Sequence, residues 1–282
     1  MRRKLLVQRF VMALTQGRSS VRPIEMQAHD PVRYVGDILA WVHQAVAMEK
    51  ELSAALFGNA AVGVSTDMEA AAAEGETENG EQQEQDAEAG DGGAGGRGGG
   101  KAAAELMSAE EVLCKVLQGI ARPLQSRVST VLESVREAGV GYRLLNLLGF
   151  YEGTVGQLAG LNSPLQDALS ECRSNADETF QRAMKREGDR LVASPPALTA
   201  DLSALPATME CAKRLTEVLQ VHTTSLMPAG EGESDLQPVL SGIVGPLVRA
   251  CKLSSQGLDP SDAAVFMLNN VDVVREALVA HA

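Results

Sequence analysis

Cysteine and histidine are the residues of this chain best suited to do chemistry. A thiol hydrolase needs a cysteine, a base that deprotonates it and a group that orients the base. Cys114, Cys172 and Cys251 fall on or beside apolar stripes of predicted helices, where a small buried hydrophobic residue is the usual role. With Cys211 they lie at least 39 residues apart. This spacing favours free structural thiols in a reducing compartment over disulfides or a zinc site.

The histidines and acidic residues form no arrangement typical of a catalytic or metal site. His29 and His43 are separated by about four helical turns, which is too far to bind one metal ion together. His222 continues the apolar stripe of its helix, so we expect it at the edge of the core. We expect Asp37 and Glu49 at solvent-facing positions, without a second carboxylate spaced for acid–base catalysis. The sequence therefore predicts no catalytic residue, no metal and no cofactor.

Two further patterns resemble ligand sites only superficially. The glycine-rich run GDGGAGGRGGGK (90–101) is followed by alanine, whereas a phosphate-binding loop needs Ser or Thr after its lysine and a hydrophobic strand before its first glycine. The aromatic residues Tyr34 and Trp41 are isolated, and the chain has no broad basic face for nucleic acid. We therefore expect neither a nucleic acid nor a small-molecule substrate.

The stretch HDPVRYVGDILAWVH (29–43) is typical of the start of a long helix. Asp30 can accept hydrogen bonds from the unpaired amides of a first turn, and Pro31 has no amide hydrogen to leave unpaired. Apolar residues then recur at steps of three and four, which predicts one buried stripe over about seven turns. The members of this stripe are Val32, Val35, Ile38, Leu39, Val42, Val46, Leu52 and Leu56.

Composition divides the chain into three parts. Hydrophobic residues make up 45% of the chain but aromatic residues only 3%, which favours packed helices over a β-sandwich. Ten acidic and two basic residues between Asp67 and Lys101 hold most of the net charge of −12. We therefore predict an all-α extended bundle or rod of antiparallel helices, with N-terminal helices over 1–62, a disordered acidic Gly-rich insert over 63–104 and the rod continuing over 105–282.

Several local signals predict where the later helices begin and end. Ser108 with Glu111 forms a capping box, and Ser163-Pro164 and Asp259-Pro260 are further helix starts. We expect a kink at Pro123 and the end of that helix at Gly139 and Gly141. Pro195-Pro196 indicates a loop. Asn270 and Asp272 are more polar than expected for the final helix.

The N-terminal run MRRKLLVQRFVMALTQGRSSVR contains no acidic residue. This composition is compatible with an organelle transit peptide and, more simply, with a basic amphipathic helix over Leu5 to Leu14. No segment reaches the approximately 18 uninterrupted apolar residues of a membrane span.

A succession of motifs resembles one known family. RFVMALT and RPIEMQAHDPVRYVGDILAWVHQAVAMEKELSAAL, together with ARPLQSRV, NLLGFYEGTV, the Pro195-Pro196 loop, PLVRACKLSSQGL and DAAVFMLNNVDVVREAL, are similar in order to the sixth subunit of the conserved oligomeric Golgi complex. The similar region is the middle region that follows the N-terminal coiled coil of that family. The resemblance covers nearly the whole chain except the insert, for which the family has no clear counterpart.

The resemblance implies a fold, a location and partners. It implies a helical-rod subunit of a vesicle-tethering complex, peripheral on the cytosolic face of the Golgi membrane. Such a subunit acts in intra-Golgi retrograde transport and Golgi organisation, with the other subunits of the complex and SNARE proteins as partners. It favours a domain interior over a transit peptide at RFVMALT. Because the family's coiled coil and later regions lie outside the similarity, we expect a fragment or a truncated gene product.

The residues at the start of the long helix are candidates for structure and assembly. We expect Asp30 and Pro31 to start the helix and Trp41 to anchor it against a neighbour, while Arg33, Asp37 and Lys50 belong to a packing or partner face. Two alternatives remain open from the residues alone. One is a generic cytosolic helical adaptor or scaffold, and the other is an unrecognised thiol enzyme.

Overall fold

The computed structural model describes residues 1–17, 22–72, 108–160, 162–224 and 236–280, with side chains at all of these positions except 57–72 and 236–238. Every regular element in these ranges is a helix, so the predicted all-α class is confirmed. The elements are α1 (Arg2–Thr15), the short 3-10 helix η1 (Ile24–Gln27), α2 (Pro31–Ala72), α3 (Ala109–Ser134), α4 (Ala138–Ala159), α5 (Pro164–Ala193), α6 (Pro206–Thr223), α7 (Leu236–Ser254) and α8 (Pro260–Val279).

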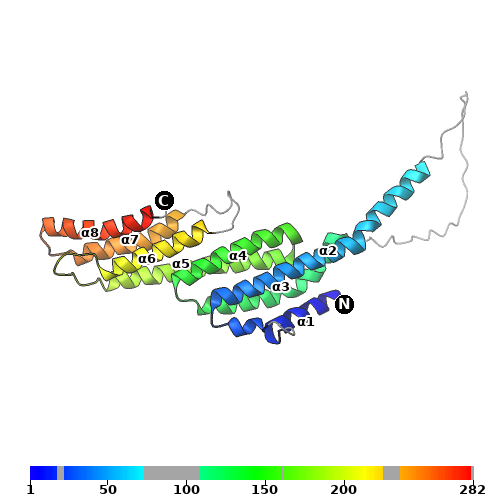
Figure 1. Ribbon diagram of the computed structural model, residues 1–282, viewed down its shortest axis with the longest axis horizontal. Coiled ribbons are helices and arrows are strands. Elements are labelled where there is room, and N and C mark those ends of the chain that lie inside the picture. The colour runs from blue at the N-terminus through cyan, green and yellow to red at the C-terminus, as the bar shows by residue number, and fades with distance from the viewer. Residues whose placement is uncertain (18–21, 73–107, 161, 225–235, 281–282) are drawn as a thin grey trace, which may run out of the picture.

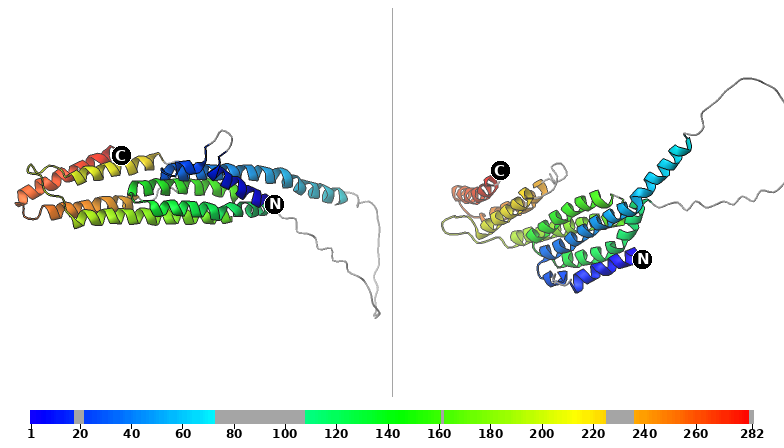
Figure 2. Two further views of the ribbon diagram at one scale, coloured as in Figure 1. Left: turned by 90° about the horizontal axis from the view of Figure 1, so that it is seen from below. Right: turned by 45° about the vertical axis from the view of Figure 1, so that its right-hand side comes forward.

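The helices form an elongated bundle in which α5 runs through both ends (Figures 1 and 2). One end contains α1 to α4, and its core includes Leu165 and Leu169 from α5. The other end contains α6, α7 and α8, and Leu191 of α5 packs against its core. A smaller cluster that includes Phe180 lies between them. The predicted extended bundle is therefore confirmed, and α5 is the helix that joins its two ends.

Side-chain caps begin several helices where the sequence predicts them. Ser108 and Glu111 form the complete capping box of α3. Ser163 accepts a hydrogen bond from the backbone N–H of Gln166 at the start of α5, and Asp259 accepts one from Ser261 at the start of α8. Each such cap is worth about 1 kcal/mol of stability.

Two helix boundaries differ from the prediction. The helical backbone of α2 continues to Ala72, so residues 63–72 of the predicted insert belong to this helix, while 73–104 lie outside the described residues. The prediction that Gly139 and Gly141 end a helix is wrong, because α3 ends at Ser134 and both glycines lie in the first turn of α4. A Cβ on Gly141 would lie 3.2 Å from the Cα of Phe180, so this glycine permits close contact between α4 and α5.

Asn270 is buried and connects α8 to α6. Its Oδ1 accepts hydrogen bonds from the backbone N–H of Leu205 at 3.0 Å and from the hydroxyl of Thr208. Its Nδ2 donates to the carbonyl of Phe266 at 2.8 Å. The sequence alone did not explain a polar residue at this position. The structure explains it, because the Asn270 side chain forms a hydrogen-bond network between α8 and α6.

Candidate interaction surface

The helix α1 lies against α3 with its apolar stripe turned inward. Leu6, Phe10 and Leu14 of α1 are buried. A Cβ on Gly119 of α3 would lie 2.8 Å from Cγ2 of Val7, so the missing side chain lets the two helices approach closely. In contrast, the backbone of α1 lies farther from that of α2, which packs on α3 and α4, and only side chains such as Phe10 and Trp41 reach across within the described residues. The two helices therefore leave an open groove between them.

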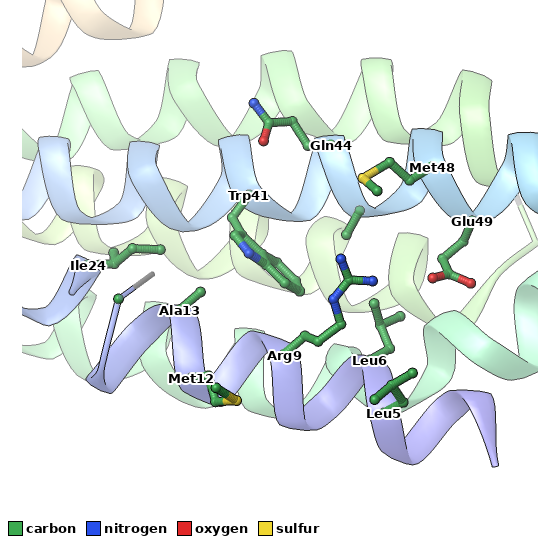
Figure 3. Close-up of a pocket in the computed structure, with 12 residues that line it drawn as sticks. Leu5, Leu6, Arg9, Met12, Ala13, Ile24, Trp41, Gln44, Met48 and Glu49 are labelled. Carbon is green, nitrogen blue, oxygen red and sulfur yellow. The ribbon is translucent and has the colours of Figure 1, made fainter. Parts of the chain in front are cut away.

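This α1–α2 groove has a volume of about 660 Å³ and is mostly apolar (Figure 3). Its residues are Leu5, Leu6, Arg9, Met12, Ala13, Gly17, Ile24, Trp41, Gln44, Ala45, Met48 and Glu49. Leu5, Met12 and Met48 expose 46%, 48% and 55% of their surface. Contiguous exposed apolar surface of this kind is typical of an interaction site.

Trp41 joins the two walls of the groove. Its ring centroid lies 5.0 Å from that of Phe10, with the planes tilted by 40°. Aromatic pairs at this separation stabilise packing beyond the area they bury. Figure 3 shows the indole directed from α2 towards α1. Trp41 therefore packs against the neighbouring helix and also contributes to the groove surface.

An ion pair lies at one end of the groove. Nε and Nη2 of Arg2 each donate to a carboxylate oxygen of Glu49, both at 2.8 Å. Glu49 is only 4% exposed, so the prediction that it faces solvent is wrong. Its carboxylate raises the pKa of Arg2, first through the side-chain hydrogen bond, and burial opposes this effect. The pair connects the start of α1 to the middle of α2.

Arg9 supplies the positive charge inside the groove. Its guanidinium lies between the ribbons of α1 and α2 (Figure 3). Within the described part of the chain it has no carboxylate partner. The helix α1 also carries Arg2, Arg3 and Lys4 and contains no acidic residue. Among these basic residues, Arg9 lines the groove, Arg2 is paired with Glu49 at its end, and Arg3 lies against Gln118 of α3. The described lining of the groove therefore combines apolar walls with the single positive charge of Arg9.

The candidate residues of the long helix do not form one surface. Asp30 starts α2, because its Oδ1 accepts a hydrogen bond from the backbone N–H of Arg33 at 3.1 Å. Pro31 is the first residue of the helix. The Arg33 side chain is exposed near the start of the helix. These three residues lie outside the α1–α2 groove.

Asp37 and Lys50 lie along the part of α2 that packs against α4. Asp37 is half-buried, and its negative charge adds to the larger effect of burial in raising the pKa of Tyr151 in α4. Lys50 Nζ donates to the carbonyl oxygen of Gln157 at 3.5 Å. Of the six candidates, only Trp41 contributes to the groove.

The buried thiols of Cys172, Cys211 and Cys251 lack the surroundings of a nucleophile. Burial raises the pKa of Cys172 to about 12 and that of Cys211 to about 11, and it also raises the pKa of Cys251. A reactive cysteine needs the opposite shift, because the thiolate is the nucleophile. Among the described residues, no hydrogen bond joins a cysteine to a histidine. These cysteines are packed as small hydrophobic residues.

Sequence reasoning missed Arg9, Met12, Met48 and Glu49 as parts of one site. A signal for Glu49 was present, since Val42, Val46 and Glu49 continue the steps of four and three that define the buried stripe. Trp41, Ala45 and Met48 repeat the same spacing on an adjacent strip of the helix. For Arg9 and Met12 the chain offered no comparable signal, because their position depends on how α1 packs against α3.

These observations define an all-helical interaction protein with a long bundle and an apolar groove. None of the described helices is long and apolar enough to cross a membrane. The described residues also contain no group of His, Cys, Asp and Glu arranged to hold a metal ion.

Comparison with known proteins identifies the family. The family model for "Conserved Oligomeric Golgi complex subunit 6, C-terminal" matches residues 1–282. The chain therefore belongs to the family of conserved oligomeric Golgi complex subunit 6. The resemblance found in the sequence motifs is confirmed.

Similar proteins from several kingdoms carry the same subunit name. The Conserved oligomeric Golgi complex subunit 6 of Arabidopsis thaliana is 31% identical over 91% of this chain and 34% of the relative. The Homo sapiens protein of that name is 30% identical over 98% of this chain and 36% of the relative. The corresponding Cryptococcus neoformans protein is 31% identical over 98% of this chain and 35% of the relative. The chain thus spans about a third of these relatives. No solved structure shows significant similarity to it.

Proposed function

We propose that this chain is a non-enzymatic part of a Golgi vesicle-tethering subunit that acts in intra-Golgi retrograde transport and Golgi organisation. The observation that carries this proposal is the family match over residues 1–282. The relatives are named as subunits of the oligomeric Golgi complex. The other subunits of that complex are therefore the proposed partners, together with SNARE proteins, at the cytosolic face of the Golgi membrane.

The architecture suits such a role. A tether needs reach and several modest contacts, and it needs no stabilised transition state. A helix rises about 1.5 Å per residue, so the 30 residues of α5 extend the bundle by about 45 Å. Separate faces along such a bundle can bind different partners. The buried thiols with raised pKa values argue against the alternative of a thiol enzyme.

Affinity purification tests the proposal. The tagged chain and the tagged full-length gene product are each expressed in cells, and co-purifying proteins are identified by mass spectrometry. A Leu117→Asp variant places a charge in the core, where Leu117 is fully buried, and serves as the unfolded control. We expect the folded chain and the full-length product to recover other subunits of the Golgi complex, and the control to recover none.

The result that contradicts the proposal is equally specific. If circular dichroism shows that the chain is folded, but neither length recovers a Golgi subunit, the chain is a helical adaptor with another function. Recovery of SNARE proteins with the full-length product tests the proposal that SNARE proteins are partners.

A further inference from the structure

We infer that the α1–α2 groove binds a short amphipathic helix of a partner protein that carries acidic residues on the side facing α1. This inference deepens the proposed function and rests on it, because it assigns one partner-binding surface to a chain proposed to work by assembly. It is carried by three properties of the groove: its exposed apolar rim, its length and its charge.

The apolar rim provides the surface for side-chain anchors. Leu5 and Met12 on α1 and Met48 on α2 line the opening, and all three are about half exposed. Methionine side chains adapt to the shape of an incoming ligand. Trp41 lies between them as a rigid aromatic surface, and tryptophan is enriched among residues that dominate binding energy.

The dimensions and the walls of the groove select a helix as the occupant. The lining residues extend from Leu5 to Ala13 on α1 and from Trp41 to Glu49 on α2. At about 1.5 Å per residue, each wall is about 10 to 12 Å long, which is about two helical turns. Both walls are helices, whose backbone groups are already paired internally, so an extended strand would find no edge to join. Anchors at positions i, i+3 or i+4, and i+7 fit this geometry.

The charge of the groove selects acidic residues on that helix. Arg9 lies in the groove without a carboxylate partner in the described residues, and it is the basic residue among those that line the groove. Glu49, the acidic residue of the lining, is already paired with Arg2, so it does not balance the charge of Arg9. A partner carboxylate beside Arg9 would form a charge-assisted hydrogen bond.

The same charge argues against two other occupants. A second copy of α1 in the groove would bring two strongly basic helices together, which is unfavourable. An anionic lipid surface complements the charge of α1, but a flat membrane cannot fill a concave groove or reach the half-buried Trp41. A partner helix satisfies both the shape and the charge.

Selection from displayed peptides tests the inference on the whole 282-residue chain. The library consists of 16-residue helical peptides with leucine at i, i+4 and i+7 and random residues elsewhere. Binding of selected peptides is then measured by fluorescence, for which Trp41 is a specific reporter because it is the only tryptophan. Arg9→Glu reverses the charge in the groove, and Met48→Lys blocks its rim.

Matched controls lie at the other end of the bundle. Arg249→Glu makes the same charge reversal at an exposed position of α7, and Met209→Lys makes the same rim substitution at an exposed position of α6. Circular dichroism establishes that each variant is folded. We expect the selected peptides to be acidic and to change Trp41 fluorescence saturably. Their Kd should rise at least tenfold with Arg9→Glu and with Met48→Lys, and it should not change with either control. Replacing the peptide glutamates by lysine should restore binding to Arg9→Glu.

Several outcomes would overturn the inference. These are a selection that enriches no peptide, selected peptides without acidic residues, and a Kd that Arg9→Glu leaves unchanged. Concentration-dependent dimers of the chain that Met48→Lys disrupts would assign the groove to a second copy. Binding of phosphatidylserine vesicles that Arg9→Glu abolishes, without peptide binding, would assign it to a membrane.

The proposed function and the groove assignment can each be refuted independently of the other. If Golgi subunits co-purify with the chain but no peptide binds, the groove assignment is wrong and the proposed function stands. If acidic peptides bind but neither length of the protein recovers a Golgi subunit, the groove binds helices and the proposed function is wrong.

Discussion

At the scale of single residues, position in the fold decides what a polar side chain does. Asn270 and Asp272 are two residues apart on α8, yet Asn270 is 2% exposed while Asp272 pairs with Arg275 near the surface. Leu205 is the N-cap residue of α6, and its side chain makes no capping hydrogen bond. Asn270 supplies an acceptor at this helix end from a neighbouring helix.

Replacing Asn270 should therefore be costly. We predict that Asn270→Leu lowers the free energy of unfolding by about 2 to 3 kcal/mol, because it leaves the buried Leu205 N–H and Thr208 hydroxyl without their acceptor. Urea unfolding followed by circular dichroism measures the change. Asp272→Ala is the control and should change the stability by less than about 1 kcal/mol, since its ion pair is near the surface. Equal stability of Asn270→Leu and wild type would refute the role of the network.

At the scale of elements, the position of α1 depends on one glycine in α3. A Cβ on Gly119 would lie 2.7 Å from Cγ of Arg3 and 2.8 Å from Cγ2 of Val7. The arginine chain can move aside, but the β-branched valine is stiff. Close contact at Gly119 therefore holds α1 against α3 and, through α1, one wall of the α1–α2 groove.

A pair of glycine substitutions separates this contact from helix propensity. A Cβ on Gly153 in α4 would meet no neighbouring atom within 4 Å, so Gly153→Ala should stabilise the protein by about 0.5 to 1 kcal/mol. Gly119→Ala gains the same helix propensity, but its added Cβ displaces α1. We therefore predict no net stabilisation by Gly119→Ala and faster hydrogen exchange of the α1 amides. Mass spectrometry of deuterium uptake measures the exchange. Equal stabilisation by both substitutions, with α1 protection unchanged, would show that the contact is unimportant.

At the scale of the whole molecule, α5 couples the two ends of the bundle. Its first half supplies Leu165, Leu169 and Cys172 to the core at the α1–α4 end. Phe180 and Met184 belong to the middle cluster, and Leu191 packs against the core of α6 to α8. Unfolding at one end should therefore be transmitted to the other through a continuous helix.

Breaking α5 should uncouple the ends. In the wild type we predict one urea midpoint, whether it is followed by fluorescence of Trp41 at one end or by labelling of buried Cys251 at the other. Asp177→Pro removes a hydrogen bond within α5 at an exposed position, costs about 3 kcal/mol and should separate the two midpoints. Asp177→Ala is the control and should keep them together. Two midpoints in the wild type would contradict the coupling.

Much of the fold was predictable because helix starts and apolar periodicity are local. Ser108, Ser163 and Asp259 cap helices at the predicted residues, since a capping side chain bonds amides only two or three residues away. The prediction for Gly139 and Gly141 was wrong because a glycine that ends a helix and one that permits helix contact look the same in the sequence. Only the approach of Phe180 distinguishes them at Gly141.

The candidate site was predictable only in part. Trp41 was identified from its place on the long helix, and it lies in the groove. Arg33 and Lys50, chosen by the same reasoning, lie elsewhere, because periodicity indicates which face of a helix is polar and not which neighbour covers it. Arg9 and Met12 became part of a site only because α1 packs against α3 and thereby lies beside α2.

Local residue patterns are enough to predict a set of capped amphipathic helices, and the order of the motifs along the chain is enough to assign the family. Both are carried by residues near one another along the chain. Three features are visible only once the helices are packed: Glu49 is buried against Arg2, Asn270 connects two helices, and α1 and α2 leave a groove. Each of these depends on contacts between residues far apart in the sequence, whose partners are chosen by the packing of whole helices.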